Sequence, residues 1–578
     1  MAEQLDQNLI SYEIPKATGT HGDIFAAVGL ALLLKTAVET EVRIIDTGLG
    51  FEVRTAQPSV DSIPPVPGYP FLKTNEKTAV PAGDFDLVDY KTEKAKADRR
   101  RKLQRAKRSK AAGAELQQLL QQDEPRADWR LLQVLNTLQG DETTNRVHAQ
   151  ILSMSTAEFR QAVAKALGSL SRFEPSGLDW PATSVQLFAP NAAKGYSRLK
   201  PDSTDRNDKT KEQWLDPFVE WLRYRGYFAA ACPYFQGDGA EHVRLLCPVP
   251  RDIDVDGLRG VVAVLRDISL PAAAPKLDSL AALKLAELLI RYSAEFHDAD
   301  KPTLIQRMRG RTPADVISAV SVTHYQSLGN AKAVSAISSV ALPGWLNLKE
   351  PNDASVFLAI LGEHQRVIRE LRHDHSDEIG LLIQYRRFLE TRGDQAIAIL
   401  IDFMARYGSL VLRGREQGRK IPQFTTANTE KLIMAHDQSL SAVLAEPGFK
   451  AVAAAIRTAT VNAQAQKAMN RPDYREIRYD LLPDLRRKAS LPGNEPLVQA
   501  ISEFISLYNV ENARRRELGK PAPRNVTTEE FESLIRLIET HGAATVGPML
   551  CAYGSCRLAR EEEPAETEND LQTVEEGD

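Results

Sequence analysis

The final part of the chain, Lys450–Arg560, repeats the spacing of amphipathic helices. From Glu495 to about Asn509, apolar side chains recur at intervals of four, three, one and three residues, so they share one helical face: Leu497, Ile501, Phe504, Ile505 and Tyr508. A second stripe covers Phe449–Ala463, and a capping box at Thr527–Glu530 begins a helix that ends at His541-Gly542. Each stripe needs a covering helix, so the spacing predicts a bundle of roughly five helices.

Arginines occupy the polar faces and the ends of these predicted helices. A guanidinium group donates two parallel hydrogen bonds and is less strongly hydrated than an ammonium group, so arginine favours phosphate. We therefore expect a nucleic-acid-binding set made of Arg457, Arg475, Arg478, Arg486, Arg487, Arg514 and Arg515. The alternative interpretation is that these arginines form weak surface ion pairs with nearby acids such as Asp473, Glu476, Asp480 and Glu511.

The most basic stretch of the sequence is Lys91–Lys110, which holds eleven basic residues against Glu93 and Asp98. It has almost no apolar stripe, so a helix here is charged all round and needs no core. A solvated helical arm is the simple interpretation, but acidic residues serve solubility better than basic ones. We predict contact with nucleic acid, steeply dependent on salt, by Arg99, Arg100, Arg101, Lys102, Arg105, Lys107 and Arg108.

Two further basic segments fall between predicted helices or strands. The loop Pro190–Lys211 mixes glycine, an aromatic residue and bases, a composition that can hold a phosphate backbone and stack on a base. Its candidate residues are Lys194, Tyr196, Arg198 and Lys200. We also predict that the glycine-broken connection Arg413–Lys420 clamps a phosphate backbone through Arg413, Arg415, Arg419 and Lys420.

A chain of 578 residues is too long for one core and predicts two to four domains. Strands and helices alternate up to about residue 350, and helices dominate beyond it, so we expect an α+β N-terminal region followed by a mostly α-helical C-terminal region. Strands are expected at Leu9–Ile14, Glu41–Ile45, Phe51–Thr55, Val185–Ala189, Tyr227–Tyr234, Glu241–Pro248 and Ile317–Tyr325. The expected segments are an α+β domain with a basic arm at 91–121 (1–175), a small α+β domain with the basic loop (176–270), a connecting mixed region (271–350), a helical region (351–447), the helical bundle (448–560) and a disordered acidic tail (561–578).

Composition favours a soluble protein of the cytoplasm. The sequence has no run of 18 apolar residues, and its first residues lack the basic and apolar regions of a signal peptide. Four scattered cysteines without nearby histidines predict reduced structural thiols rather than a disulfide framework or a zinc site. The acidic tail carries nine acids and no base, so the rest of the chain has a net charge of +5.

No convincing catalytic set stands out, and we predict neither a metal nor a cofactor. The spacing of Gly19 and Gly22 resembles a phosphate loop only weakly, because the lysine and the hydroxyl-bearing residue of such a loop do not follow them. His364, His373-Asp374-His375 and Asp402 resemble the residue types of metal phosphohydrolases of the HD type. The first two elements are too close in sequence to lie on separate helices that converge on a metal ion.

Several segments together resemble the large subunit of the CRISPR-associated type I surveillance complex, often called Cascade. They are Ala455–Val461, Tyr474–Leu481, Glu503–Ile505 with Tyr508–Asn512, and Val526–Arg557, which ends in Ala552-Tyr553-Gly554. The resemblance covers mostly the C-terminal third and is one of overall pattern, since this family is very divergent.

The resemblance implies a non-catalytic subunit, because in that family a recruited helicase-nuclease cuts the DNA. It implies that the N-terminal part senses the motif flanking the DNA target, and that the C-terminal bundle is similar to a separate small subunit. The implied partners are guide RNA, target DNA, other subunits of the complex and the helicase-nuclease, with no membrane partner. It also suggests an internal start for a small subunit, near Met404 or Met434.

Two other functions remain open at this stage. One is a scaffold that binds only protein through its helical bundle. The other is a metal-dependent phosphohydrolase centred on His364, His373 and Asp374, which predicts a bound divalent metal.

Overall fold

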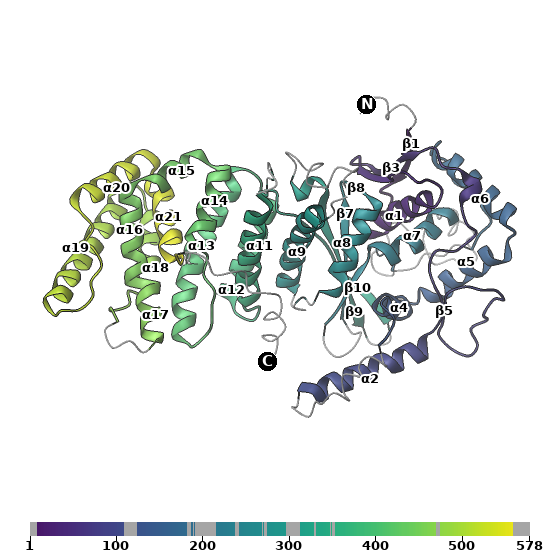
Figure 1. Cartoon of the computed structure of the whole chain (residues 1–578), viewed down its shortest axis with the longest axis horizontal. Helices are drawn as coiled ribbons and strands as arrows, with labels where there is room; N and C mark the ends of the chain where they lie inside the picture. Colours follow the sequence, from purple (N-terminus) through teal and green to yellow (C-terminus); the bar gives the residue numbers. More distant parts are fainter. Residues whose placement is uncertain are drawn as a thin grey trace. The chain divides into compact units, whose positions relative to one another are not determined.

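The computed structural model describes residues 9–108, 124–181, 187–188, 190, 216–236, 242–268, 270, 274–295, 312–328, 331–346, 348, 353–469 and 474–558 (Figure 1). The chain divides into two compact units. Unit 1 comprises Met1–Pro343 and Leu348–Pro351, and unit 2 comprises Gly344–Asn347 and Asn352–Asp578. Unit 1 mixes strands and helices, whereas the named elements of unit 2 are helices, so the predicted fold class is confirmed.

The first sheet of unit 1 is antiparallel and has the strand order β1-β3-β2-β8. Its strands are β1 (Leu9–Pro15), β2 (Arg43–Asp46), β3 (Gly50–Ala56) and β8 (Asp252–Asp254). Alternate residues of β1 and β3 face the core, as Ile14 and its partner Phe51 do. The hairpin β2–β3 matches the one predicted from the sequence.

The second sheet has the strand order β10-β9-β7-β6, and all its pairs are antiparallel. Its strands are β6 (Cys232–Gln236), β7 (His242–Pro250), β9 (Ile317–Leu328) and β10 (Ala331–Ala341). The strand predicted at Tyr227–Tyr234 is wrong in its first half, because the preceding helix continues to Ala230. The strand predicted at Val185–Ala189 lies largely outside the described residues.

Helices α1 (His21–Lys35) and α7 (Pro217–Ala230) cross at the centre of unit 1. Nearly every side chain of α1 is buried, because the helix contacts α7, the first sheet and β7. Glycines make the crossing close: a Cβ at Gly29 would clash with the Leu222 carbonyl oxygen, and one at Gly226 with the Phe25 carbonyl oxygen. The two backbones therefore touch where the core is densest.

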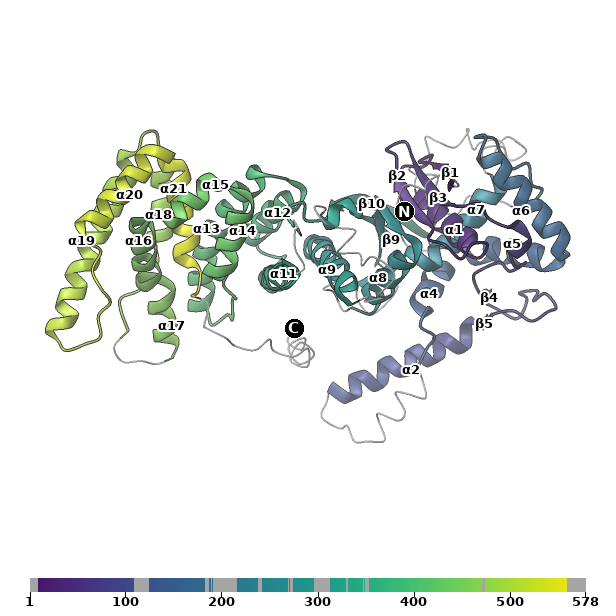
Figure 2. The ribbon, with the colours of Figure 1, turned by 45° about the horizontal axis from the view of Figure 1, so that its top comes forward.

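The remaining elements of unit 1 surround this centre (Figures 1 and 2). They are η2 (Val60–Ser62), the parallel pair β4 (Phe71–Lys73) and β5 (Leu87–Asp89), α2 (Tyr90–Arg108), α4 (Trp129–Thr137), α5 (Asp141–Ser153), α6 (Thr156–Leu170), α8 (Val255–Asp267), α9 (Ala274–Glu295) and η5 (Pro313–Asp315). The predicted boundaries at 175/176 and 270/271 do not separate compact units. Strand β8 pairs with β2, and β9 pairs with β7, so each boundary is bridged by a shared sheet.

Unit 2 begins with α11 (Asp353–Glu370), α12 (Ser376–Glu390), α13 (Asp394–Glu416), α14 (Thr426–His436) and α15 (Gln438–Ala445). Helix α13 lies at the centre of the unit and packs on α12, α18 and α21. Among the described helices, α13 is long and apolar enough to cross a bilayer, and the bent pair Gln438–Ala445 and Pro447–Ala468 passes the same test together. Since 67% of the apolar stretch of α13 is buried within unit 2, it has the character of a core helix.

The bundle predicted at 448–560 is formed by α16 (Pro447–Arg457), η6 (Thr458–Asn462), α17 (Ala463–Ala468), α18 (Leu481–Ala489), α19 (Glu495–Glu517), α20 (Thr528–His541) and α21 (Ala543–Ser555). The Thr527–Glu530 capping box is confirmed. Helix α19 extends to Glu517, well beyond the predicted end near Asn509. The bundle shares unit 2 with α11–α15, because α13 packs on α18 and α21.

A π-helical segment, η6, joins α16 to α17. In such a segment the i→i−4 hydrogen bonds are interrupted, which frees carbonyl oxygens for other partners. The Ala459 carbonyl oxygen accepts a hydrogen bond from the Arg478 backbone N–H at 2.9 Å. The Gln464 amide group donates to the Leu412 carbonyl oxygen of α13 at 2.5 Å. The π-helical segment is thus tied to the chain that precedes α18, and α17 is tied to α13.

Candidate nucleic-acid interface

The first turn of α2 fixes this basic helix to unit 1. The Tyr90 ring packs on Trp129, with 5.2 Å between ring centroids. The Glu93 carboxylate accepts hydrogen bonds from Lys96 Nζ at 2.7 Å and from the Arg126 backbone N–H at 3.0 Å. Burial alone would raise the pKa of Glu93, but these bonds outweigh it and lower the pKa. Glu93 therefore stays ionised and anchors the start of the helix.

Beyond its first turn, α2 carries its charge into solvent. The helix has ten basic residues against two acidic ones, and Figures 1 and 2 show it running away from the rest of unit 1. Arg99, Arg101 and Lys102 are exposed, and Arg100 pairs with Glu124 at 3.0 Å. At 1.5 Å per residue the helix is about 28 Å long. One DNA strand presents about eight phosphates over that length.

The other predicted residues of this arm and of the basic loop fall outside what the structure describes. The side chains of Arg105, Lys107 and Arg108 are not described, although the backbone there is helical. The loop residues Lys194, Tyr196, Arg198 and Lys200 also lie outside the described residues.

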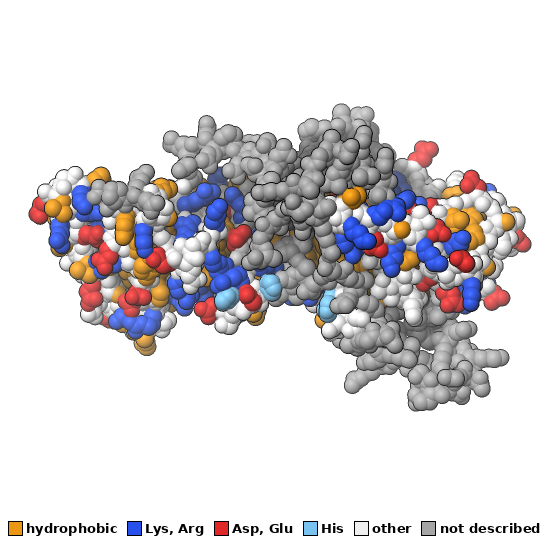
Figure 3. Space-filling view, turned by 90° about the horizontal axis from the view of Figure 1, so that it is seen from below, with side chains coloured by type: hydrophobic (Ala, Val, Ile, Leu, Met, Phe, Trp, Pro, Cys, Tyr) orange, Lys and Arg blue, Asp and Glu red, His pale blue; other side chains and the backbone are white. Residues whose placement is uncertain are grey.

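Basic side chains also gather at the end of α13 in unit 2. Figure 3 shows lysines and arginines concentrated over the part of unit 2 that α12 and α13 form. We call this group the α13 patch, and its members are Arg372, Arg413, Arg415, Arg419, Lys420 and Lys467. The sequence analysis missed Arg372 and Lys467, because they come from α11–α12 and α17 and join the group only through folding.

The members of the α13 patch differ in how free their charges are. Arg413 is 60% exposed and lies 3.6 Å from Asp377, and Lys420 is exposed. Arg415 instead donates two hydrogen bonds to the Ile421 carbonyl oxygen, at 2.8 and 3.2 Å. The predicted glycine-broken connection is therefore partly wrong: Arg413–Glu416 is the last turn of α13, and Arg415 closes the turn that follows it.

The buried Glu378 side chain organises the other side of the α13 patch. Arg419 donates to its two carboxylate oxygens at 2.8 and 3.1 Å, and Arg372 donates through its side chain at 2.8 Å and its backbone at 2.7 Å. Burial alone would raise the pKa of Glu378, but these bonds lower it to about 2. One carboxylate thus holds two guanidinium groups together, which leaves a net positive charge at this site.

Two arginines predicted to bind nucleic acid lie inside the bundle. Arg457 is 4% exposed and donates to the Cys556 and Tyr553 carbonyl oxygens at 2.7 and 2.8 Å. Arg475 is 3% exposed, lies over the Tyr508 ring and pairs with Glu511 at 2.9 Å. The prediction that their guanidinium groups lie on outer faces is wrong, because both groups are buried and bonded to partners within unit 2.

The other predicted arginines of the bundle reach its surface. Arg487 and Arg514 are exposed, whereas Arg478, Arg486 and Arg515 are half-buried. Arg487 pairs with Asp484 at 2.5 Å, and Arg515 donates to the Pro521 carbonyl oxygen at 3.0 Å. Local pairing, the alternative drawn from the sequence, therefore describes Arg475 and Arg487.

The loop before α1 does not cradle a phosphate. The Thr18 and Gly19 backbone N–H groups, which such a loop would offer, donate to the Asp23 carboxylate at 2.7–3.2 Å. Gly22 is required for packing, since a Cβ there would clash with the Phe188 carbonyl oxygen. The glycine spacing that weakly resembled a phosphate loop is therefore explained by the capped start of α1 and by its close packing in the core.

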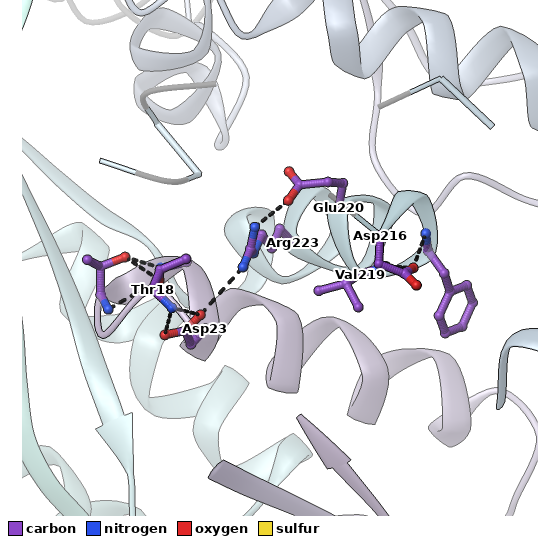
Figure 4. Close-up of polar contacts among 9 residues, drawn as sticks. Thr18, Asp23, Asp216, Val219, Glu220 and Arg223 are labelled. Atoms are coloured by element: carbon purple, nitrogen blue, oxygen red, sulfur yellow. Dashed lines mark hydrogen bonds and ion pairs between the residues drawn. The ribbon is translucent and has the colours of Figure 1, made fainter. Parts of the chain in front are cut away.

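Asp23 belongs to a buried charge network that joins α1 to α7 (Figure 4). Arg223 lies 3.5 Å from Asp23 and donates to Glu220 on its own helix. Burial is the largest cause of the raised pKa of both carboxyl groups, and Arg223 opposes it. The sequence signal for this network is a Glu-x-x-Arg pair inside a mostly apolar helix.

The residues of the phosphohydrolase hypothesis do not form a metal site in the part of the chain that the structure describes. His364 is buried among Trp345, Phe388 and Phe424, and its Nδ1 hydrogen-bonds the Tyr385 hydroxyl group at 2.8 Å. Burial lowers the pKa of His364 to about 3. His373 and Asp374 are exposed, and among the described residues no three His, Cys, Asp or Glu side chains gather as metal ligands do.

No protein-family model matches the chain, and no curated protein is significantly similar to it.

Proposed function

We propose that this chain is a non-catalytic subunit that binds nucleic acid, and that it serves as the large subunit of an RNA-guided type I surveillance complex in the cytoplasm. The observation that carries the proposal is α2. It is anchored by one turn, and it exposes a dense row of cations with no apolar face that would need a protein partner.

A second basic surface supports the same function. The α13 patch belongs to unit 2, so each unit contributes cations suited to a phosphate backbone. In an RNA-guided complex the guide reads the target sequence by base pairing, and the protein holds backbone and senses the flanking duplex. Such a subunit needs no catalytic residues, because the recruited helicase-nuclease supplies the cutting activity.

The packing of α13 helps to decide which internal methionine could begin a small subunit that folds. A start at Met434 removes α13, against which α18 and α21 pack, whereas a start at Met404 keeps the second half of that helix. We therefore propose Met404 as the better start of the two for a fragment that folds.

The function is tested by co-expressing the chain with its genomic neighbours, purifying it and extracting the nucleic acid that comes with it. Short RNAs of uniform length with a shared repeat-derived end are the expected result. If neither RNA nor partner proteins co-purify with the chain, the proposal is wrong.

A protein-only scaffold is the second candidate, and one observation favours it. Arg457, Arg475 and Arg515 in the bundle are engaged with groups of their own chain. A scaffold predicts no binding of nucleic acid at physiological salt, so a binding measurement with the purified protein separates the two candidates.

A further inference from the structure

A groove of about 510 Å³ lies between α19 and α20 on the surface of unit 2. Its apolar lining is Val498, Phe531 and Ile535, which are half-buried. The exposed carboxylates of Glu495, Glu503 and Glu539 also line it, together with the polar residues Asn494, Gln499 and Ser502.

Hydrogen bonds at both ends hold the two helices that form the groove. At one end the Ala543 backbone N–H donates to Asn494 Oδ1 at 3.0 Å. At the other end the Asn509 side chain exchanges hydrogen bonds with the Val526 backbone, at 2.9 and 3.1 Å. The groove is therefore framed by two antiparallel helices whose spacing is fixed.

The charge around the groove is negative and unbalanced. No lysine or arginine lines it, and in the part of the chain that the structure describes Glu495, Glu503 and Glu539 form no ion pair. Glu503 accepts a hydrogen bond from the Gln499 side chain at 3.0 Å, which leaves its charge uncompensated. Other glutamates of the bundle differ, since Glu511 and Glu530 are both paired with arginines.

Exposed apolar side chains continue this surface along α19. Leu507 is 53% exposed and lies four residues beyond Glu503, and Val510 is 65% exposed and lies eight beyond Ser502. These intervals return to the same side of a helix. The acidic groove thus extends into an apolar strip, which separates it from the exposed Arg514 farther along α19.

We propose that this groove binds an amphipathic helix of a partner protein, one whose apolar face is flanked by lysines or arginines. An apolar floor between two helices accepts the apolar face of a third helix. The three carboxylates are placed to meet basic side chains at its edges, and they repel phosphate, so nucleic acid does not fit. This surface is separate from α2 and the α13 patch, and its partner does not depend on the proposed function.

A synthetic peptide provides the test on the purified full chain. The probe is a fluorescein-labelled, lysine- and leucine-containing helix with its leucines on one face, and binding is followed by fluorescence anisotropy. Two control probes are a peptide of the same composition with its leucines scattered, and a helix with glutamate in place of lysine. The groove variant is Glu495→Lys/Glu503→Lys/Glu539→Lys, with the corresponding glutamine triple as a milder change.

The matched control protein reverses three exposed glutamates elsewhere in unit 2, as Glu370→Lys/Glu476→Lys/Glu517→Lys. We expect the groove variant to bind the basic amphipathic peptide about tenfold more weakly than the unmodified chain, because three carboxylates that attract the peptide are replaced by cations that repel it. The control variant is expected to bind it unchanged, and the scattered and acidic peptides are expected to bind weakly.

Equal binding of the amphipathic and scattered peptides, or equal loss in both triple variants, would overturn the proposal in favour of general charge attraction. Failure of the basic amphipathic peptide to bind would also overturn it. Self-association of the chain that the groove variant abolishes would identify a second copy as the occupant and refute a basic partner. Nucleic-acid binding through α2 is measured separately, so failure of one proposal leaves the other standing.

Discussion

Helix α2 and the C-terminal bundle are both rich in arginine, yet they use it in opposite ways. In α2, Arg99 and Arg101 have few apolar neighbours at helical spacing and stay in solvent. In α16, Arg457 follows a broad apolar face formed by Phe449, Val452 and Ile456, and the packing of α21 against α16 encloses it. The comparison teaches that apolar neighbours one and two turns away decide where an arginine lies, whatever the local charge density.

The acceptors of Arg457 show why an arginine is buried there. Helix α21 ends at Ser555, and the last carbonyl oxygens of a helix lack partners within it. Arg457 donates to two oxygens at this end, those of Tyr553 and Cys556. A cation also stabilises the negative end of the helix dipole. Arg457 therefore caps α21 from a neighbouring helix, a role that the sequence of α16 does not reveal.

The largest expected effect is on stability, from Arg457→Ala. The change removes the donor of the Cys556 carbonyl oxygen and one of the two donors of the Tyr553 carbonyl oxygen, and it opens a cavity. We therefore expect a loss of about 3 kcal/mol in the free energy of unfolding. Urea denaturation measures it. Arg487→Ala, at an exposed ion pair, is the control and should cost under about 0.5 kcal/mol. If both variants lost a similarly small amount of unfolding free energy, the proposed difference between buried and exposed arginines would be wrong.

A second large loss is expected in Glu378→Gln, which removes the charge that holds Arg372 and Arg419 together. Breaking a buried ion pair by removing one partner costs about 3 kcal/mol. Because the pKa of Glu378 is lowered from its ordinary value of 4.5 to about 2, its contribution is complete above pH 4.5 and is lost as the pH falls toward 2. The difference in unfolding free energy between the unmodified chain and Glu378→Gln should therefore become smaller as the pH falls from 7 to 3.

Acid should weaken both units through buried histidines before Glu378 titrates. Burial lowers the pKa of His21 and His148 in unit 1 to about 4, and that of His364 in unit 2 to about 3. A base with a lowered folded pKa stabilises fully above its unfolded value of about 6.5, and that stability is lost as the pH falls. From pH 7 to 5 we expect about 2 kcal/mol of lost stability for each histidine.

The measurement is denaturation at pH 7 and pH 5, with His364→Gln as the comparison for unit 2. The variant should lose less stability between the two pH values than the unmodified chain. An equal acid response in both proteins would show that His364 is not the source of the effect in unit 2.

The smallest effect on stability is expected in α2. The triple variant Arg99→Ala/Arg101→Ala/Lys102→Ala removes exposed charges from a helix whose anchor is Glu93, so the free energy of unfolding should change by under about 0.5 kcal/mol. A loss of several kcal/mol would mean that these side chains hold the fold, and would make α2 resemble the bundle instead of contrasting with it.

Much of the fold could be predicted from the sequence, because the apolar spacing is local. The capping box at Thr527, the β2–β3 hairpin and the change to helices near residue 350 all appear as predicted. The end of α19 was placed too early, because its last turns carry few apolar residues and the helix continues without a buried stripe. The sheets that unite three predicted segments depend on pairing between distant strands, which spacing alone does not encode.

The candidate site was predicted only in part, for a similar reason. The exposed residues of α2 need no tertiary partner, so composition is a good guide to them. Arg457 and Arg475 depend on helices that arrive later in the chain, and Arg372 and Lys467 join the α13 patch only when distant helices pack. Local charge density therefore predicts a basic surface correctly where no other element packs over the basic residues, and wrongly where another helix buries them.

The most direct test of the account is the salt dependence of DNA binding by the purified chain and two triple variants. One is the α2 variant above, and the control is Lys165→Ala/Arg172→Ala/Arg259→Ala, which removes three exposed cations elsewhere in unit 1. The account predicts that the slope of log K against log salt falls by about 2.7 in the α2 variant alone, since each phosphate contact contributes about 0.9. An unchanged slope in the α2 variant, or the same loss in the control, would contradict the claim that α2 binds nucleic acid.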